Sequence, residues 1–551
     1  MRLRLRQTTA LSKTAVYRCR IALCRYARDE SGVLIKPTLA IFLSMLAVGG
    51  VGVDLMRMER DRTELQYTLD RAVLAAADLD QPLSPAAVVM DYLSKAGLSE
   101  YYQAPYEDPD NGFGYRKVSS TVNTDFETHY MNLTGVSSIP IYASSTAEES
   151  IDGLEISLVL DVSGSMRSNS RLTNLKVAAK EFITTMVANT TPGKMSISIV
   201  PYATQVSGTD KLFEQFTLTD DNDYSNCINF TDDDFRTTSL STEIRHERTM
   251  HFSPWTSRDG RTYYSTPSLV SSPVCVADDD REMLLFEQDE ATLKNFINNL
   301  VATGNTSIDI GMKWGSALLD RSTQPAIEKL TQGVGATISA DFADRPSRYD
   351  DPDTLKVVVL MTDGQNTSQY FIEPEHRSGD SGIWYNATAK RYSSFYQYYD
   401  DKYGVGYYWD DPGYDYRSSN WRSHPYGDHE TGDAVRLSQA ELWAYTGLKY
   451  VYKYIYNDWM HSDDAKAEWY YGVYDYVRSS EKNTRTKAIC DSAKAQGIIV
   501  YTIGFEAPSS GRAVLKDCAS SDAHFFDVDG LEISEAFASI ATSIRQLRLT
   551  Q

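Results

Sequence analysis

From residues 156–160 to the end of the chain, apolar, β-branched runs alternate with amphipathic stretches. After the first run, Leu175, Ala179, Phe182 and Met186 recur at helical spacing and predict one buried helix face. Continuous apolar runs are typical of strands buried on both faces of a parallel sheet. We therefore expect an α/β fold with a doubly wound, mostly parallel sheet. Its strands are predicted at residues 156–160, 195–201, 355–362, 498–505 and 524–528.

The amino-terminal pattern is different, because residues 37–53 contain no charged side chain. With Lys36 and Asp54 reaching the headgroups, this stretch is long enough to cross a bilayer core of about 30 Å. We expect residues 1–32 to form a basic cytoplasmic tail and residues 33–56 a transmembrane anchor. A cleaved signal peptide is the alternative, but the basic leader is long and no small-x-small cleavage site follows directly. By the positive-inside rule the bulk of the chain then lies outside, in the periplasm.

Residues 57–80 continue as a helical pattern, predicted to form a stalk. Its apolar positions alternate in steps of three and four residues: Met58, Leu65, Leu69, Ala72, Ala76 and Leu79. This spacing indicates either a seam for a second helix or packing against the chain's own next domain, and both interpretations stay open. Residues 81–153 are predicted to be a small membrane-proximal α/β region, with a strand at 139–143 and a turn at 108–112.

Two long inserts interrupt the sheet domain, which we place at residues 154–551. The first, at about 205–285, contains three acidic runs, interpreted as solvated loops with weak Ca²⁺ binding as the alternative. The second, at about 366–480, is rich in Tyr and Trp. Ser438 and Glu441 predict a capping box there, followed by a helical hairpin to about residue 477. Its aromatic residues form either its own core or an exposed recognition surface. Both inserts follow carboxyl ends of strands, so we expect them on the same sheet edge.

The net charge limits the kinds of partner, and the positions of the cysteines predict their pairing. The net charge of −21 makes a nucleic-acid partner unfavourable. Cys19 and Cys24 fall in the tail and are expected to be reduced thiols. The other four cysteines allow three connectivities. We expect disulfides between Cys227 and Cys275, which share the first insert, and between Cys490 and Cys518, which flank the strand at 498–505.

Candidate metal ligands follow two of the predicted strands. Asp161, Ser163 and Ser165 alternate along a tight turn that Gly164 allows to bend. Asp363 ends the strand at 355–362, and Thr306 precedes a predicted helix. Carboxylate and hydroxyl oxygens favour a hard cation, so the expected cofactor is Mg²⁺, with Mn²⁺ or Ca²⁺ as alternatives.

These three segments resemble the metal-ion-dependent adhesion site (MIDAS) of von Willebrand factor A domains. The resemblance implies that Ser163, Ser165 and Thr306 contact the metal, while Asp161 and Asp363 hold it directly or through water. In that family one coordination position is open, and a partner protein's carboxylate fills it. The implied function is metal-dependent protein binding of the adhesion type.

The amino-terminal segments resemble a second family. The basic tail, RYARDESG before the apolar stretch, VDLMRMERDRTELQ after it and the alanine-rich LDRAVLAAADL are similar to TadE/TadG-like proteins of tight-adherence (Flp) pilus systems. The resemblance implies a single-pass inner-membrane subunit of the pilus-assembly machine, with other machine proteins as partners.

We expect no enzymatic activity. A metal-dependent periplasmic hydrolase is one alternative, but the chain has no HExxH motif, nucleophile elbow or Walker loop. An A-domain chaperone or signalling protein unrelated to pili is the other.

Overall fold

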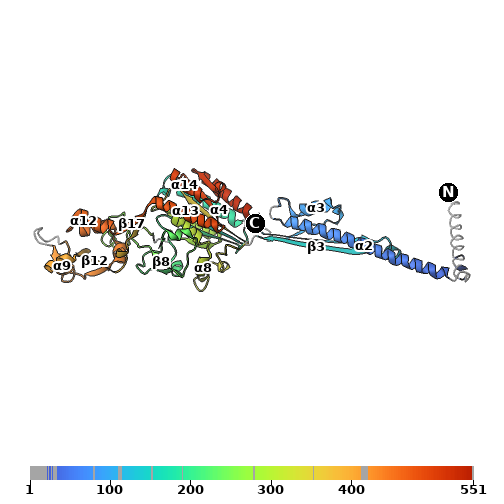
Figure 1. The fold of residues 1–551 in the computed structure, drawn as a ribbon, viewed down its shortest axis with the longest axis horizontal. Coiled ribbons are helices and arrows are strands. Elements are labelled where there is room, and N and C mark those ends of the chain that lie inside the picture. The colour runs from blue at the N-terminus through green and yellow to red at the C-terminus, as the bar shows by residue number, and fades with distance from the viewer. Residues whose placement is uncertain are drawn as a thin grey trace. The chain divides into compact units, whose positions relative to one another are not determined.

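The computed structural model describes residues 22, 24, 25, 28, 34–78, 81–108, 115–150, 153–188, 190–276, 280–351, 353–410 and 420–548. Cys19, Leu79, most of the basic tail, most of the turn at 108–112 and part of the third acidic run lie outside these residues. The chain forms two compact units (Figure 1). Unit 1 comprises residues 1–111 and 115–150, and unit 2 comprises residues 112–114 and 151–551.

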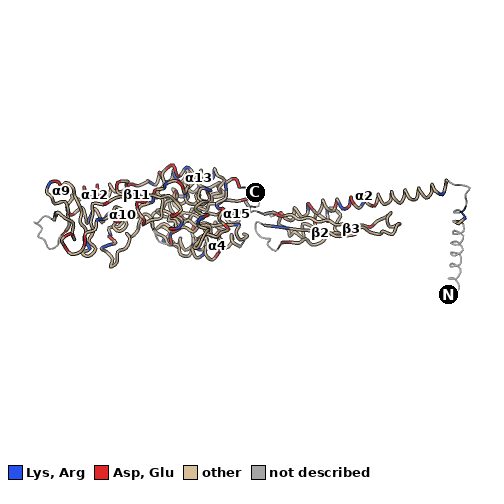
Figure 2. Tube along the Cα trace, turned by 90° about the horizontal axis from the view of Figure 1, so that it is seen from below, with Lys and Arg blue, Asp and Glu red and all other residues tan. Residues whose placement is uncertain are grey.

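Unit 1 is built on one long helix, α2 (Ile35–Ala77). Its 43 residues span about 65 Å at 1.5 Å per residue. The predicted anchor and stalk are therefore one continuous helix. Its amino-terminal half carries almost no charge, whereas charged side chains mark the other half (Figure 2). Among the described residues, α2 is the one helix long and apolar enough to cross a membrane.

The second half of α2 packs against the rest of unit 1. Leu65, Leu69 and Ala72 are fully buried in a core shared with Val122 and Ile141. Of the two interpretations of the stalk, packing within its own unit is thus the one observed. The partners are α3 (Pro85–Lys95), η1 (Ser99–Tyr101), β1 (Tyr106–Glu107) and a long hairpin of β2 (Tyr115–Glu127) and β3 (Ser138–Ser150), joined through η2 (Met131–Thr134).

Unit 2 contains a six-stranded sheet in the order β19-β18-β10-β4-β5-β9. Five strands are parallel, and β9 pairs antiparallel with β5. Counted along the chain, the order is 3-2-1-4-5-6, which reverses direction between β4 and β10. The strands are β4 (Gly153–Asp161), β5 (Met195–Tyr202), β9 (Leu284–Glu287), β10 (Thr354–Thr362), β18 (Ile499–Phe505) and β19 (Phe525–Val528).

Helices cover both faces of this sheet, because alternate strand side chains point to opposite sides. Leu158 belongs to the core under α4 (Arg171–Ala188), α6 (Glu290–Asn299) and α15 (Glu532–Arg548). Val159 belongs to the opposite core, under α7 (Ile308–Ala317), α8 (Gln324–Leu330), α13 (Ser479–Ala495) and α14 (Ser509–Cys518). The expectation of a mixed α/β fold preceded by one apolar helix is confirmed.

The first insert lies between β5 and β9, and the second lies between β10 and α13. The first contains α5 (Asp210–Phe213), β6 (Thr217–Leu218), β7 (Ile228–Asn229), η4 (Asp233–Arg236) and β8 (Arg245–Arg248). The second contains β11 (Gln369–Ile372), β12 (Asp380–Asn386), β13 (Arg391–Phe395), α9 (Gln397–Tyr403), β14 (Tyr407–Tyr408), β15 (Trp421–Arg422), β16 (Val435–Ser438), α10 (Gln439–Tyr445), α11 (Leu448–Tyr450), the π-helical η8 (Val451–Tyr456), α12 (Ser462–Lys466), the π-helical η9 (Ala467–Tyr471) and β17 (Tyr474–Val477).

The second insert corrects the predicted helical hairpin. The capping box of Ser438 and Glu441 is present, but the helices after it are short, and the segment ends in β17. The insert also contains a five-stranded antiparallel sheet, β15-β14-β13-β12-β16, which the pattern did not predict. Trp443 and Tyr456 are buried in the insert's own core, whereas Tyr398 and other tyrosines are exposed.

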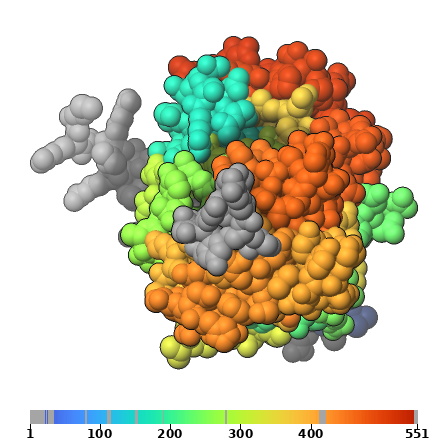
Figure 3. Space-filling model, turned by 90° about the vertical axis from the view of Figure 1, so that its left-hand side faces the viewer, coloured from blue at the N-terminus to red at the C-terminus, as the bar shows by residue number. Residues whose placement is uncertain are grey.

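The two inserts pack together into one body. Phe252 and Val274 of the first insert share a core with Ile383 and Trp443 of the second. The amide of Val270 also donates to the carbonyl of Ala444, at 2.8 Å. Figure 3 looks onto this end of unit 2, where the orange atoms of the second insert cover much of the visible face.

Two side chains of the acidic runs in the first insert make ion pairs with other segments of unit 2. Asp221 accepts from the buried guanidinium of Arg377, at 2.5 Å, and Arg377 also contacts Glu247. Asp232 pairs with Arg485 of α13, at 2.6 Å. Asp221 and Asp232 therefore join the first insert to other segments of unit 2, whereas Asp220, Asp223 and Asp233 are 96%, 100% and 89% exposed, as expected of solvated loops.

Both disulfides connect the cysteines that the sequence interpretation paired. Cys227 is joined to Cys275, across a separation of 48 residues, and Cys490 to Cys518, across 28 residues. The second bridge ties α13 to α14 on one face of the sheet. Cys24 is an exposed free thiol.

Candidate metal centre

The candidate ligands gather at the carboxyl edge of the sheet, where the strand order reverses. Asp161 ends β4, and Asp363 directly follows β10. These two strands are adjacent and parallel, so their carboxyl ends lie side by side. In open α/β sheets this switch point is where ligands bind, because the loops diverge there and leave a crevice.

Four of the five predicted ligands form one hydrogen-bonded set. The amide of Ser163 donates to Asp161 Oδ1, at 2.8 Å. The hydroxyl oxygens of Ser163 and Ser165 lie 3.0 Å apart. Ser165 Oγ donates to Asp363 Oδ1, at 2.6 Å. Residues separated by about two hundred positions in the chain thus meet through side-chain oxygens.

Thr306 borders the same set from a third loop. The amide of Gly164 donates to the carbonyl of Gly304, at 3.0 Å, which ties the two loops together. A Cβ built on Gly364 would lie 3.4 Å from Thr306 Oγ1, so this hydroxyl faces the loop that carries Asp363. The backbone of Thr306 is fixed in turn by Thr367, whose Oγ1 accepts from the Thr306 amide at 2.9 Å.

Asp161 is in an electrostatically unfavourable position at this edge. Its side chain is fully buried, and this burial, together with the nearby charge of Asp363, raises its pKa to about 7. Hydrogen bonds from the Thr362 hydroxyl and from Ser163 oppose the shift, because they stabilise the carboxylate. Two carboxyl groups in one crevice therefore hold less than two full negative charges in the metal-free protein.

Arg171 and Glu506 belong to the site, and the sequence analysis missed both. Arg171 Nη1 donates to Asp363 Oδ2, at 2.9 Å, and its Nε donates to Glu506 Oε2, at 2.8 Å. Glu506 directly follows β18, so the rule that ligands bind at carboxyl ends of parallel strands could have identified it. Nothing in the spacing of Arg171 indicated its contact.

A buried ion pair supports the Thr306 loop from behind. Lys482 Nζ lies 3.5 Å from Asp309 Oδ1, and both side chains are completely buried. The same ammonium donates to the carbonyl of Thr306, at 3.3 Å, and to the hydroxyl of Ser307. Burial lowers the pKa of Lys482 and raises that of Asp309, while each charge favours the ionised form of the other.

The chemistry of the donor set fits a hard divalent cation. It offers two carboxylates and three hydroxyls, with no thiolate or imidazole among them. Across the described part of the chain, no cluster of three His, Cys, Asp or Glu side chains offers a different metal site. A cation beside Asp161 and Asp363 would relieve the repulsion that raises the Asp161 pKa.

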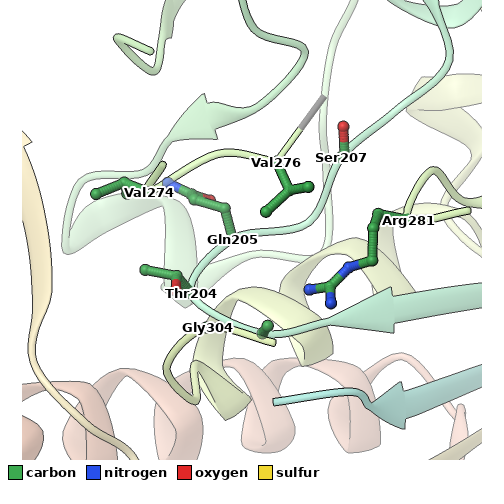
Figure 4. A pocket seen from close by; sticks show the side chains of 8 residues that line it. Thr204, Gln205, Ser207, Val274, Val276, Arg281 and Gly304 are labelled. Atoms are coloured by element: carbon green, nitrogen blue, oxygen red, sulfur yellow. The ribbon is translucent and has the colours of Figure 1, made fainter. Parts of the chain in front are cut away.

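A small cavity lies beside the Gly304 turn (Figure 4). Its lining includes Thr204, Gln205 and Arg281, and the Arg281 guanidinium points toward the Gly304 loop. Arg281 Nη1 donates to the carbonyl of Val301, at 2.7 Å. The volume of about 10 Å³ accommodates one water molecule and no organic ligand. This cavity is therefore too small to be a second binding site for an organic ligand.

Residues 33–79 match the family model for Flp pilus-assembly TadE/G-like proteins. No curated protein matches the chain. Among solved structures, the von Willebrand factor domain of the type V pili tip protein Mfa5 from Porphyromonas gingivalis is 14% identical, with a TM-score of 0.29. That match covers 72% of this chain and 95% of the other.

The pilus adhesin SpaC from Lactobacillus rhamnosus GG is 13% identical, with a TM-score of 0.28, and the match covers 81% of this chain and 33% of SpaC. A point mutant of the PilB minor pilin from Streptococcus sanguinis is 12% identical, with a TM-score of 0.27 over 81% and 79% of the two chains. Likenesses this weak do not assign a fold or a function.

Proposed function

We propose that this protein is a membrane-anchored, metal-dependent binding subunit of a tight-adherence pilus-assembly system. In this proposal unit 2 is a doubly wound von Willebrand A-like domain with a MIDAS. The observation that carries the metal-binding role is the hydrogen-bonded set of Asp161, Ser163, Ser165 and Asp363 at the switch point of the sheet. The pilus role is supported by the family match at residues 33–79.

In the proposed site, Ser163, Ser165 and Thr306 hold Mg²⁺ through their hydroxyls, and Asp161 and Asp363 balance its charge. Mn²⁺ and Ca²⁺ share the preference for oxygen donors. The bound cation supplies a Lewis-acidic position that attracts a carboxylate of a partner protein. Arg171 holds Asp363 in place through one guanidinium edge and Glu506 through the other, so the loop geometry is fixed before the cation arrives.

The membrane anchor in this proposal is the apolar half of α2, as in Tad pilus proteins. We propose that it spans the inner membrane once, with the amino terminus in the cytoplasm and unit 2 in the periplasm. The two disulfides are consistent with an oxidising compartment. Other pilus-machine proteins are the proposed partners, and one of them donates the carboxylate.

Ser163→Ala tests the metal role directly. The full chain in detergent micelles is heated with Mg²⁺ or with a chelator, and tryptophan fluorescence follows unfolding. A ligand at one hundred times its Kd stabilises the folded state by about 2.7 kcal/mol. We expect the wild type to melt higher with Mg²⁺ and Ser163→Ala to lose this response. Ser539→Ala, an exposed hydroxyl on α15, is the matched control and should respond like the wild type.

A capture experiment separates adhesion from a purely structural ion. Wild-type protein and Ser163→Ala are cross-linked in cells that carry the pilus system, well below the melting temperature of either. We expect pilus-machine proteins to be recovered with the wild type and lost with Ser163→Ala. Undiminished recovery with the variant would reject metal-mediated binding and leave the exposed tyrosines of the second insert as the binding surface.

We also propose that the protein is not an enzyme. A hydrolase would need a general base beside a metal-bound water. The candidate ligands are carboxylates and hydroxyls, and the neighbouring guanidinium of Arg171 stays protonated. A turnover screen of the purified protein with and without Mg²⁺ tests this point, and Mg²⁺-dependent hydrolysis lost in Ser163→Ala would overturn it.

A further inference from the structure

The turn that joins β2 to β3 in unit 1 exposes several large apolar side chains. Leu133 is 86% exposed, Tyr130 is 51% exposed and Val136 is 39% exposed. All three lie in the connection at residues 128–137, which contains η2. Single exposed apolar side chains are common on protein surfaces, whereas a cluster of them marks a contact surface.

The position of this turn along α2 identifies what it contacts. A Cβ built on Gly50 would lie 2.8 Å from Tyr130 Cβ, so the turn touches the helix at that glycine. Gly50 belongs to the last turn of the uncharged stretch, which ends before Asp54. The exposed apolar side chains therefore lie beside the end of the proposed membrane span.

Asp54 of α2 holds the turn in place beside the end of the apolar stretch. Its carboxylate, completely buried, accepts hydrogen bonds from the amides of Tyr130 and Met131, at 2.6 and 2.7 Å. Arg57 lies 3.7 Å from the other carboxylate oxygen. Because charge-assisted bonds of this kind are short and strong, the turn is fixed to the helix and does not move independently along it.

The turn also satisfies its own polar backbone. The amide of Val136 donates to the Met131 carbonyl, at 3.1 Å, and the amide of Leu133 donates to the Tyr130 carbonyl, also at 3.1 Å. The Thr134 hydroxyl donates to the Met131 carbonyl as well, at 2.7 Å. Entering a lipid interface is costly for unpaired backbone groups, and several of those groups are paired here, within the turn or with Asp54.

We propose that the β2–β3 turn is a second membrane contact, in which Leu133, Val136 and Tyr130 enter the lipid interface beside the end of the α2 span. Tyr130 suits the headgroup level, where tyrosine is enriched, and Leu133 extends toward the acyl chains. A lone helix can rotate and tilt in a bilayer, whereas two contact points fix the orientation of unit 1. This inference rests on the proposed membrane anchor.

Lipid quenching tests the contact in the full chain. Cys19 and Cys24 are replaced by serine, and one cysteine carrying an environment-sensitive fluorophore is placed by Leu133→Cys, Leu46→Cys or Tyr142→Cys. The protein is reconstituted into phosphatidylcholine–phosphatidylglycerol vesicles that carry nitroxides both near the headgroup end and near the methyl end of the acyl chain. Tyr142 is 58% exposed and lies four residues, roughly 13 Å, along β3 from its first residue, so it reports on a position outside the interface.

We expect blue-shifted, quenched emission from the labels at 46 and 133 and unquenched emission from the label at 142. Quenching at 46 without quenching at 133 would overturn the second contact and leave the anchor intact. An unquenched label at 46 would overturn the anchor itself, and with it this inference.

A second variant shows whether the turn or the label enters the lipid. Adding Val136→Asp to the chain labelled at 133 should reduce quenching at least twofold, because a charge resists the interface. The backbone bonds of the turn do not involve this side chain, so the turn keeps its shape. Tyr142→Asp in the same labelled chain is the control and should leave quenching unchanged. Equal quenching with and without Val136→Asp would show that the label alone inserts, which would overturn the proposal.

Discussion

Replacing Asp161 by asparagine removes the buried negative charge at the switch point and keeps its shape. The amide oxygen can still accept from the Ser163 amide, and the new NH₂ group can donate to the Thr362 hydroxyl, which then acts as an acceptor. In metal-free protein we therefore expect Asp161→Asn to be more stable than the wild type near neutral pH.

The size of this effect follows from the Asp161 pKa. Folding raises it from 3.8 to about 7, so the folded state binds the proton more tightly than the unfolded state. The contribution of Asp161 to stability is consequently fully present below about pH 4, and it is lost as the pH rises through 7. At about 1.4 kcal/mol per pKa unit, the loss is about 4 kcal/mol at pH 8 and below about 2 kcal/mol at pH 5. Asparagine does not titrate and avoids this loss.

The assay is urea unfolding of the full chain in micelles with a chelator, at pH 5 and pH 8. All eight tryptophans lie in unit 2, so their fluorescence follows the unit that contains the site. We expect the stability gain of Asp161→Asn to be larger at pH 8 than at pH 5. Mg²⁺ should stabilise the wild type and not the variant.

Asp233→Asn is the control for removing a negative charge, because this side chain is 89% exposed. It should change stability little at either pH. A gain for Asp161→Asn that is equal at pH 5 and pH 8 would refute the titration argument. A loss of stability at both pH values would show that the carboxylate itself holds the loop.

Three further predictions concern other parts of the chain. Replacing Cys490 and Cys518 by serine should lower the free energy of unfolding by roughly 3–4 kcal/mol, the chain-entropy value for a loop of 28 residues. Urea unfolding of the oxidised wild type and of the variant measures this difference. Equal unfolding midpoints would contradict the prediction. Lys482→Met leaves Asp309 charged and buried, so we expect the free energy of unfolding to fall by about 3–5 kcal/mol. Adding Asp309→Leu should restore part of this loss. If it restores none, the loss comes from packing and not from the unpaired charge. A reporter enzyme active only in the periplasm, fused after Gln551, should be active in a Gram-negative host, and activity of a cytoplasmic reporter instead would reverse the topology.

The sequence predicted the elements of unit 2 that have strong local patterns. Its apolar runs matched β4, β5, β10 and β18, because strands buried on both faces leave a continuous signal. The ends of β4 and β10 then placed Asp161 and Asp363 at one edge, since adjacent parallel strands end together. The metal role of these residues stays a prediction.

Contacts between distant segments could not be read from local patterns. Arg171 and Glu506 join the site through long-range ion pairs that no spacing rule encodes. The short strands of the second insert gave no alternating signal, because several are only two residues long. The stalk pattern was ambiguous for a different reason. A helix that packs on a sheet and one that packs on another helix bury the same kind of stripe.

The union of the two inserts into one body has a consequence for how the protein is made. Phe252 and Val274 are synthesised well before their core partners Trp443 and Tyr456. At 5–20 residues per second, the ribosome needs roughly 10–40 s to add the intervening residues, and the core around these apolar side chains is incomplete during that time. The body formed by the two inserts thus has a high contact order and can complete its folding only after the carboxyl-terminal third of the chain has been made. Truncation before residue 443 would leave the apolar side chains of the first insert exposed to aggregation.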